Sequence, residues 1–415
     1  MLAFATFFAL MLFFSTTLKI YLDQRQIRFV FAHRDKIPLA FQQTIDLKSH
    51  QKAADYTITK TRLNLIHHVY DAMVMIFLTF GGGLLWLDTH ILKLMEGLAA
   101  HLTFILGVFL LLAIIELPFN VYRVFGIEKK FGFNRMKPGL FIRDMMLHTL
   151  VLLVLGLPLL MAILWIMQTY KNNWWIAAWF VFISFNLIIL AIYPIFIAPI
   201  FNRFKPLTDD NLKNRIQDLL EKCQFKVSGL FVMDGSTRSS HGNAYFTGLG
   251  QFRRIVFFDT LINQLEPDEV VAVLAHELGH YKLQHVKKRI ALMFAISFLG
   301  LWLLANLMTH PWFFSGLGLP ISGNAEALLL FMITGPIFLF PFTPIGSWYS
   351  RRHEYEADNY ATKHIAKEKL IDSLVKLFKD NASTLTPDPL YSLFYDSHPG
   401  AQARISNLRK INSID

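Results

Sequence analysis

Long apolar runs are the dominant pattern in this sequence. A membrane-spanning helix needs about 20 predominantly apolar residues, and seven runs approach or exceed that length. They are residues 1–18, 67–87, 98–115, 145–170, 174–201, 290–308 and 327–350. So many long apolar helices would overfill the core of a soluble protein, and the first run lacks the positive region that begins a signal peptide. The pattern predicts a mainly α-helical, polytopic membrane protein with seven transmembrane helices.

The polar segments give the domain organisation and the orientation. Residues 1–201 hold spans one to five with their loops, 202–289 form a first polar region, 290–350 hold spans six and seven, and 351–415 form a second polar region. Lys and Arg are concentrated in alternate loops. The positive-inside rule then places the N-terminus outside and both polar regions in the cytoplasm.

Composition agrees with this topology. Hydrophobic residues make up 54% of the chain and charged residues 17%, whereas soluble domains carry about 25% charged residues. The net charge of +10 follows from basic cytoplasmic loops that face anionic lipid, so it does not require a nucleic-acid partner. The single cysteine, Cys223, excludes an intrachain disulfide.

The first polar region contains the motif HELGH at residues 276–280. Residues four apart share a helix face, so His276 and His280 can bind one metal ion, with Glu277 beside them as general base for a water molecule. Pro267, followed by two acidic residues, is typical of the first turn of a helix that leads into the motif. The alternative is a pair of surface histidines, and a third ligand decides between the two.

Glu354 is the predicted third ligand. If the motif helix continues into the sixth span, His280 to Thr309 covers 29 residues, or about 44 Å, and the return from Ala327 to Glu354 covers 27 residues, or about 41 Å. An antiparallel hairpin of these lengths returns Glu354 to the level of His280. Two histidines and one carboxylate form a catalytic zinc site with an open position. The alternative for Glu354 is a solvated charge paired with neighbouring arginines.

Three further polar residues lie near the predicted ligands in the sequence, and each is assigned a different role. Asp358 lies one turn after Glu354 and is predicted to hydrogen-bond a ligand histidine. Glu356 faces another side of the same helix and is a weaker ligand candidate. His285 is five positions beyond His280, where metzincins place their ligand six positions on, and is interpreted as an ordinary polar residue near the membrane surface.

Residues 230–233, 243–247 and 254–258 are predicted to form short strands of a small β-sheet. An exposed strand edge beside a zinc site can hold a substrate peptide by main-chain pairing. The candidate substrate edge consists of Asn243, Ala244, Tyr245 and Phe246. A purely structural sheet is the alternative.

His398 lies directly before Pro399. A lone His before Pro is commonly a loop residue, but a His near the zinc can also donate a hydrogen bond to an oxyanion.

The sequence resembles the type I CAAX prenyl proteases, which are integral-membrane zinc endopeptidases. The resemblance goes beyond HELGH and extends from about residue 60 to residue 405. The matching segments are EKKFGFN at 128–134, parts of 193–207, RSSHGNAYF at 238–246, SRRHEYEAD at 350–358, Ser397-His398-Pro399 and Arg404.

The resemblance implies one zinc ion per chain, bound by His276, His280 and Glu354, with Glu277 as the base. It also implies seven spans around a large water-filled chamber, with a cytoplasmic zincin-like catalytic region. The residues implied to act around the ion are Asp358, His398, Arg404 and Asn243. The polar residues within spans that this chamber would accommodate are His68, Asp71, Glu116 and His148.

We therefore expect a zinc-dependent membrane endopeptidase that cleaves prenylated CAAX-type peptides or membrane-associated proteins. The compact loops favour a bacterial inner membrane, and in a bacterium the alternative is a quality-control protease with no prenyl requirement. A transporter-like protein and an inactive zinc-binding protein fit the intact Glu277 less well. The expected partners are a peptide or protein substrate and the lipid bilayer, and no particular oligomeric state is predicted.

Overall fold

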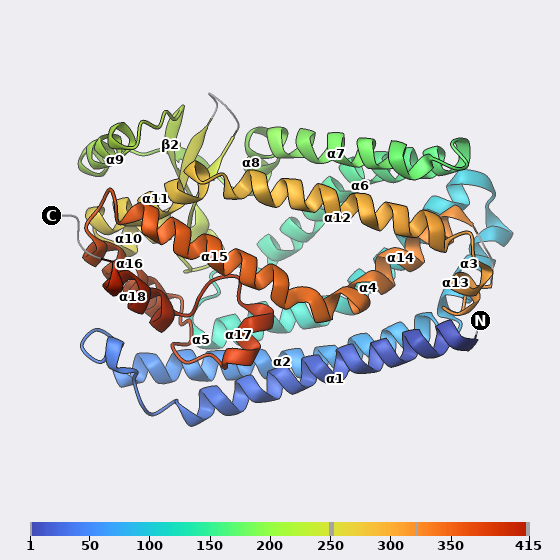
Figure 1. Ribbon diagram of the computed structural model, residues 1–415, viewed down its shortest axis with the longest axis horizontal. Coiled ribbons are helices and arrows are strands. Elements are labelled where there is room, and N and C mark those ends of the chain that lie inside the picture. Colours follow the sequence, from blue (N-terminus) through green and yellow to red (C-terminus); the bar gives the residue numbers. More distant parts are fainter. Residues whose placement is uncertain (1, 249–252, 321–322, 412–415) are drawn as a thin grey trace.

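The computed structural model describes residues 2–248, 253–320 and 323–411. Residue 1 of the first predicted span and short stretches at 249–252, 321–322 and 412–415 lie outside the described part. The molecule is elongated, with long helices along its length and a small sheet at one end (Figure 1). The helices of the membrane region are α1 (Leu2–Ala32), α2 (Leu47–Leu78), α3 (Gly83–Leu94), α4 (Gly97–Val121), α6 (Pro138–Thr169), α7 (Trp174–Ile192), α12 (His285–Leu307), α13 (Pro311–Ser315), α14 (Asn324–Leu339) and α15 (Thr343–Ala361).

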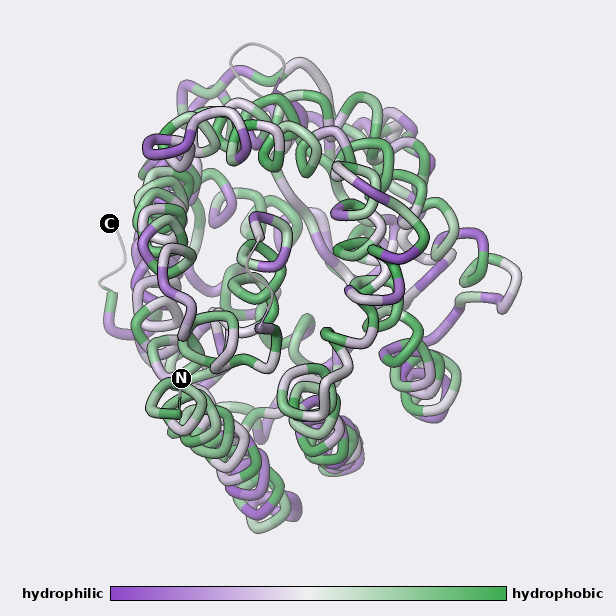
Figure 2. Tube along the Cα trace, turned by 90° about the vertical axis from the view of Figure 1, so that its right-hand side faces the viewer, coloured by the Kyte–Doolittle hydropathy of each residue, from purple (hydrophilic) through white to green (hydrophobic). Residues whose placement is uncertain are grey.

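Six helical segments among the described residues are long and apolar enough to cross a membrane, and a bent pair of helices makes a seventh if it is counted as one span. Some of these segments join several elements. A π-helical turn, η2 (Tyr122–Glu128), and α5 (Lys129–Phe131) continue α4, whereas η3 (Tyr193–Ile197) and α8 (Ala198–Phe201) continue α7. The prediction of a mainly helical, polytopic membrane protein is therefore confirmed. Viewed along the long axis, these helices lie around the rim of the molecule, with hydrophobic positions along most of them (Figure 2).

The second predicted span, residues 67–87, is bent and does not form one continuous helix. Helix α2 ends at Leu78 and α3 begins at Gly83 with a bend of 50°. Three consecutive glycines cause the break, and Gly82 has a left-handed φ of +76° that other residues rarely adopt. The span is consequently a bent pair, with α3 as the short outer arm.

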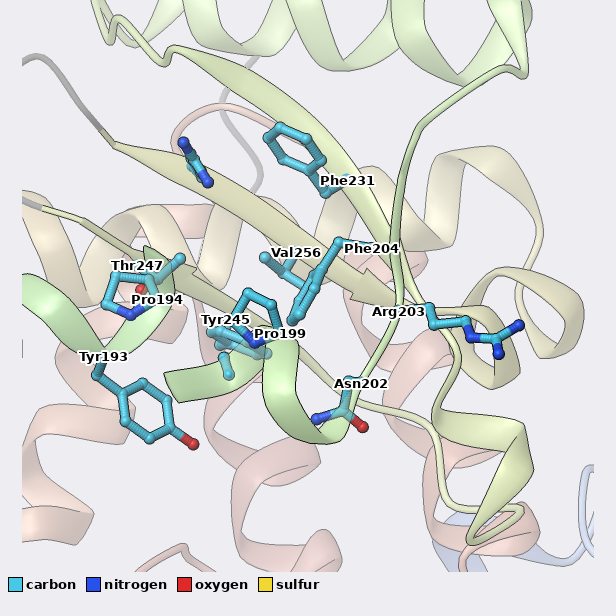
Figure 3. A pocket seen from close by; sticks show the side chains of 12 residues that line it. Tyr193, Pro194, Pro199, Asn202, Arg203, Phe204, Phe231, Tyr245, Thr247 and Val256 are labelled. Atoms are coloured by element: carbon cyan, nitrogen blue, oxygen red, sulfur yellow. The ribbon is translucent and has the colours of Figure 1, made fainter. Parts of the chain in front are cut away.

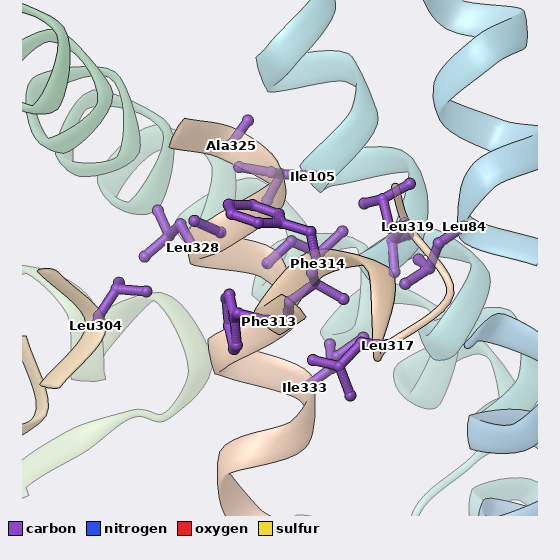
Figure 4. Close-up of a cluster of buried hydrophobic side chains, with 14 of the residues drawn as sticks. Leu84, Ile105, Leu304, Phe313, Phe314, Leu317, Leu319, Ala325, Leu328 and Ile333 are labelled. Carbon is purple, nitrogen blue, oxygen red and sulfur yellow. The ribbon is translucent and has the colours of Figure 1, made fainter. Parts of the chain in front are cut away.

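A buried apolar cluster fills the end of the bundle that lies opposite the sheet (Figures 1 and 4). The short helix α13 inserts Phe313 and Phe314, each 2% exposed, among Leu84 of α3, Ile105 of α4 and Leu328 of α14. Apolar side chains that would otherwise face lipid or water are thereby packed against one another. This cluster holds the outer ends of several spans together.

The end of the molecule that holds the two polar regions contains a four-stranded sheet in the order β1-β2-β4-β3. Strands β2 and β4 are parallel, and β1 and β3 pair antiparallel on either side of them. The strands are β1 (Phe204–Pro206), β2 (Gly229–Met233), β3 (Ala244–Thr247) and β4 (Arg254–Phe258). The helices of the polar regions are α9 (Asp210–Lys222), α10 (Asp259–Gln264), α11 (Pro267–Lys282), α16 (Lys367–Asp380), α17 (Pro389–Tyr395) and α18 (Ala401–Lys410). Short 3-10 turns are η1 (Leu39–Phe41), η4 (Gly235–Thr237) and η6 (Phe340–Phe342).

The two polar regions share one hydrophobic core. Ile216 and Phe257 from the first region pack in the same cluster as Leu370, Leu374 and Leu408 from the second. These segments are separated in the chain by two membrane spans, so the core can form only when α12 and α14–α15 fold back on one another. This folding places α11 against α15.

Gly318 gives a test of the packing at the outer end. It has a left-handed φ of +78°, and a Cβ added there would lie 2.0 Å from the backbone oxygen of Thr79 at the end of α2. We expect Gly318→Ala to destabilise the protein by about 2 kcal/mol or more, because it combines a left-handed alanine with a backbone clash. Thermal unfolding in detergent would measure this change. Gly107→Ala on α4, where a Cβ meets no atom within 4 Å, is the control, and equal stability of the two variants would contradict the prediction.

Candidate metal centre

The motif lies on α11, whose start is fixed by local interactions. Glu266 and Glu269 form a reciprocal capping box around Pro267, which satisfies backbone N–H groups of the first turn. One face of the helix packs into the core beside the sheet through residues such as Val270 and Leu274, which are 1% and 0% exposed. His276 lies on a different side of the helix, two residues after Leu274, and is also buried, at 6% exposed.

Helix α15 packs closely against α11 because the motif contains a glycine. A Cβ on Gly279 would lie 2.9 Å from Cα and 3.0 Å from the carbonyl oxygen of Ala357. Only a hydrogen side chain permits this approach. The contact brings Glu354, one turn before Ala357 on α15, to the histidines of α11.

The structure brings His276, His280 and Glu354 together. Nε2 of His276 and Nε2 of His280 lie 3.2 Å apart, and each lies 3.3 Å from an oxygen of Glu354. One atom from each side chain can therefore reach a common ion. Oε2 of Glu354 is buried and has no hydrogen-bond partner within the described ranges. Two imidazole nitrogens and an unsatisfied carboxylate are a donor set that fits zinc.

Asp358 and Arg404 hold the other side of His276. Oδ1 of Asp358 lies 2.8 Å from Nδ1 of His276, and Arg404 donates two hydrogen bonds to Asp358, of 2.8 and 2.6 Å. Burial and the charge of Arg404 disfavour protonation of His276, but the adjacent carboxylates of Asp358 and Glu354, which accept from its ring N–H groups, outweigh them and raise its pKa to about 9. The carboxylates thus favour a positive charge at this position.

The interpretation of His285 as an ordinary polar residue near the membrane surface is wrong. Its side chain is fully buried, with Nδ1 3.0 Å from Nδ1 of His280 and Nε2 3.0 Å from Oε2 of Glu356. Its ring stacks on His353 at a centroid distance of 4.0 Å. His285 therefore contacts the nitrogen of His280 that does not face the candidate ion.

A helix break explains this difference. The motif helix was expected to continue into the sixth span, but α11 ends at Lys282 and Gln284 has a left-handed φ of 58°. The chain turns there, so the first residue of α12 points back to the motif. A spacing of five residues on a continuous helix would have pointed His285 away. Sequence periodicity contains no signal for a break at a glutamine.

His398 and Glu277 border the centre from two sides. Nε2 of His398 lies 3.4 Å from Oε1 of Glu354, although 65% of the His398 side chain is exposed. Glu277 is the next residue to His276 on α11 and is partly exposed. A cavity of about 580 Å³ opens beside His398. It is lined by His398 and Arg404 and, from the membrane helices, by Gln26, Thr57 and Asn64.

Strand β3 contains most of the candidate substrate segment and contacts α11. It pairs with β4 alone in the described part of the sheet, so its other edge is open. Its side chains alternate between two surroundings. Ala244 and Phe246 face the core, whereas Tyr245 and Thr247 line a second cavity of about 360 Å³ between the sheet and the end of the fifth span (Figure 3). Asn243 precedes the strand and is exposed.

Comparisons with known proteins cover almost the whole chain. Residues 26–203 match the model of the CAAX prenyl protease N-terminal region with five membrane helices, and residues 206–412 match peptidase family M48. CAAX prenyl protease 1 homologues from Arabidopsis thaliana and Homo sapiens are 34% and 30% identical to it, covering 95% and 97% of this chain and 94% and 95% of their own. CAAX prenyl protease 1 of Saccharomyces cerevisiae is 32% identical over 90% of this chain and 88% of its own. The crystal structure of S. mikatae Ste24p superposes with a TM-score of 0.90 at 30% identity, covering 98% of both chains.

His285→Ala tests whether the contact with His280 supports metal binding. Removing such a partner of a ligand histidine commonly lowers metal affinity about 10- to 100-fold, and we expect a loss in that range from competition with a chelator. His353→Ala, which removes the stacked ring but not the contact with His280, is the matched control and should lose less. Equal losses in the two variants would mean that packing, rather than the contact, is responsible.

Proposed function

The chain belongs to the M48 peptidase family, with the membrane helices of the CAAX prenyl proteases at its N-terminus, and on this premise we propose that it uses zinc at this centre to cleave prenylated CAAX-type peptides. That it is a polytopic membrane metallopeptidase follows from the family itself. The zinc identity, the residue roles and the substrate class are the proposal. The observation that carries it is the triangle of His276, His280 and Glu354 atoms at 3.2–3.3 Å beside Glu277.

In the proposed reaction, Glu277 takes a proton from the attacking water and passes it to the leaving amine. When bound, the metal supplies a Lewis acid that polarises the scissile carbonyl. Asp358 holds His276 through Nδ1, at 2.8 Å, and thereby fixes which nitrogen is free to bind the ion. His398 borders Glu354 from the cavity side and would donate a hydrogen bond to the oxyanion.

Arg404 is proposed to act through the carboxylates around His276 and not by touching the substrate. It is 7% exposed, and its guanidinium binds Asp358 bidentately. Its NH1 group lies 3.9 Å from Oε2 of Glu354. We assign it to neutralising and orienting these two carboxylates, which keeps the arrangement around His276 fixed.

The open edge of β3 is the proposed seat of the substrate main chain. Asn243 accepts a β-ladder bond from Phe258 through its carbonyl, so the alternate residues Ala244 and Phe246 direct their backbone groups to the open edge. The N–H of Ala244 is bonded to Oδ1 of Asn243 at 2.8 Å. An incoming peptide would replace this side-chain acceptor with its own carbonyl.

The substrate class rests on the names of the relatives, which are CAAX prenyl proteases. The membrane compartment is a separate question. The relatives of this chain include proteins from plants, fungi and mammals. They do not favour the expected bacterial inner membrane, and orientation with both polar regions in the cytoplasm stays a prediction from the basic loops. The partner in the reaction is a peptide or protein.

Glu277→Gln tests the catalytic assignment. We expect cleavage of a farnesylated CAAX peptide to fall about 100- to 10,000-fold, because general-base catalysis contributes that much, whereas zinc content should not change. Cleavage would be followed by mass spectrometry with purified protein in detergent, and Glu221→Gln on the exposed face of α9 is the control. Unchanged cleavage by the Glu277 variant would overturn the role of this residue.

The same assay with an unprenylated peptide tests the substrate class. Preference for the farnesylated peptide supports the proposal. Equal cleavage of both peptides would favour a broader membrane-protein protease, and Glu277-dependent cleavage of either one keeps the peptidase assignment intact.

A further inference from the structure

A second group of metal-binding side chains lies within the helix bundle. His67 and Asp71 occupy successive turns of α2, and Glu116 approaches them from α4. Nε2 of His67 lies 2.5 Å from Oε2 of Glu116 and 3.5 Å from Oδ1 of Asp71. Together with His68, the residues His67 and Asp71 can each present one ligand atom within 4.8 Å of the others.

His68 is held by a buried carboxylate of α1. Its Nε2 lies 3.3 Å from Oδ2 of Asp23, which is 1% exposed. Nδ1 of His68 is buried and has no hydrogen-bond partner in the described part of the chain. This arrangement parallels Asp358 and His276, where a carboxylate contacts one ring nitrogen and leaves the other free for an ion.

The three carboxylates of this group, Asp23, Asp71 and Glu116, lie beside two histidines and near one lysine. Within the described ranges, the ion pairs of Asp23, Asp71 and Glu116 involve histidines alone. Neither oxygen of Asp23 accepts a hydrogen bond from a described residue. The amine of Lys19, one turn before Asp23, lies 4.9 Å over the ring of Phe340 and forms no ion pair within the described ranges, although its charge acts on Asp23 and Asp71 from nearby. Three carboxylates among membrane helices are costly without cations between them.

Protonation of the two histidines, together with the charge of Lys19, would balance the three carboxylates but would leave the buried Nδ1 of His68 as an N–H without an acceptor among the described residues. A divalent ion supplies the charge and also gives each unsatisfied atom a partner, Nδ1 of His68 among them. Imidazole nitrogens mixed with carboxylate oxygens are donors that suit zinc better than magnesium or calcium.

We propose that His67, His68, Asp71 and Glu116 form a second zinc site, with Asp23 orienting His68. It is separate from the candidate catalytic centre, and it brings the expected one ion per chain to two. Its ligands come from α2 and α4, and Asp23 adds α1, so the ion ties three helices together. Gln26 and Asn64, which lie about one turn from Asp23 and His67 along α1 and α2, line the cavity that reaches His398. The site therefore braces the wall of this cavity.

Metal analysis of purified protein tests the proposal. After removal of metal with a chelator, addition of excess zinc and dialysis of the unbound metal into metal-free buffer, we expect about two zinc ions per wild-type chain by elemental mass spectrometry. The variant His276→Ala/His280→Ala should retain about one, and His67→Ala/Glu116→Gln should also retain about one. One ion in the wild type and none in the His276→Ala/His280→Ala variant would overturn the second site, as would two ions in the His67→Ala/Glu116→Gln variant.

Two further measurements guard against misfolding. Glu116→Gln alone preserves shape and should weaken zinc binding at the second site, whereas Glu96→Gln, at an exposed position before α4, should not. In the His276→Ala/His280→Ala background, zinc should raise the unfolding temperature only while Glu116 is intact. A zinc-induced rise of the same size after the added substitution Glu116→Gln would contradict the proposed ligands.

Discussion

The close approach of α11 and α15 is the constraint on which the centre depends. Because Gly279 has no side chain, α11 lies directly against Ala357 of α15. The adjoining turns of the two helices then bring side-chain atoms of His276, His280 and Glu354 to within 3.3 Å of one another. These residues come from opposite ends of a membrane hairpin made of α12 and α14–α15. The apolar packing of the spans and of the core shared by the two polar regions therefore positions the polar atoms that one ion would bind together.

Around this contact, each histidine is fixed through its second nitrogen. Asp358, itself held by Arg404, contacts His276, and His285, itself held by Glu356, contacts His280. These outer partners come from three elements, α12, α15 and α18, and surround the histidines of α11. The geometry of the centre is consequently a property of the whole end of the molecule that holds the sheet, because a shift of any one element moves a ring or a carboxylate.

Much of this arrangement could be predicted from the sequence because it depends on local patterns. Apolar runs predict the membrane helices, HELGH places two histidines on one face, and matched helix lengths bring Glu354 back to them. The break at Gln284 and the bend after Leu78 could not be predicted as readily, since they depend on backbone conformations and tertiary packing that hydropathy does not report. The contact of His285 with His280 was missed because of that break, and the group around His67 requires three helices to be placed side by side.

The break at Gln284 also has a mechanical consequence. An uninterrupted helix would carry every change of tilt in the sixth span, such as that caused by a thinner or thicker bilayer, straight into the motif. A residue with left-handed backbone between two helices absorbs such rotation at its own dihedral angles. Lipid-driven movement of α12 would then reach His280 only through its first residue, His285, so the bilayer would act on the orientation of one imidazole ring while the pairing of α11 with α15 stays in place.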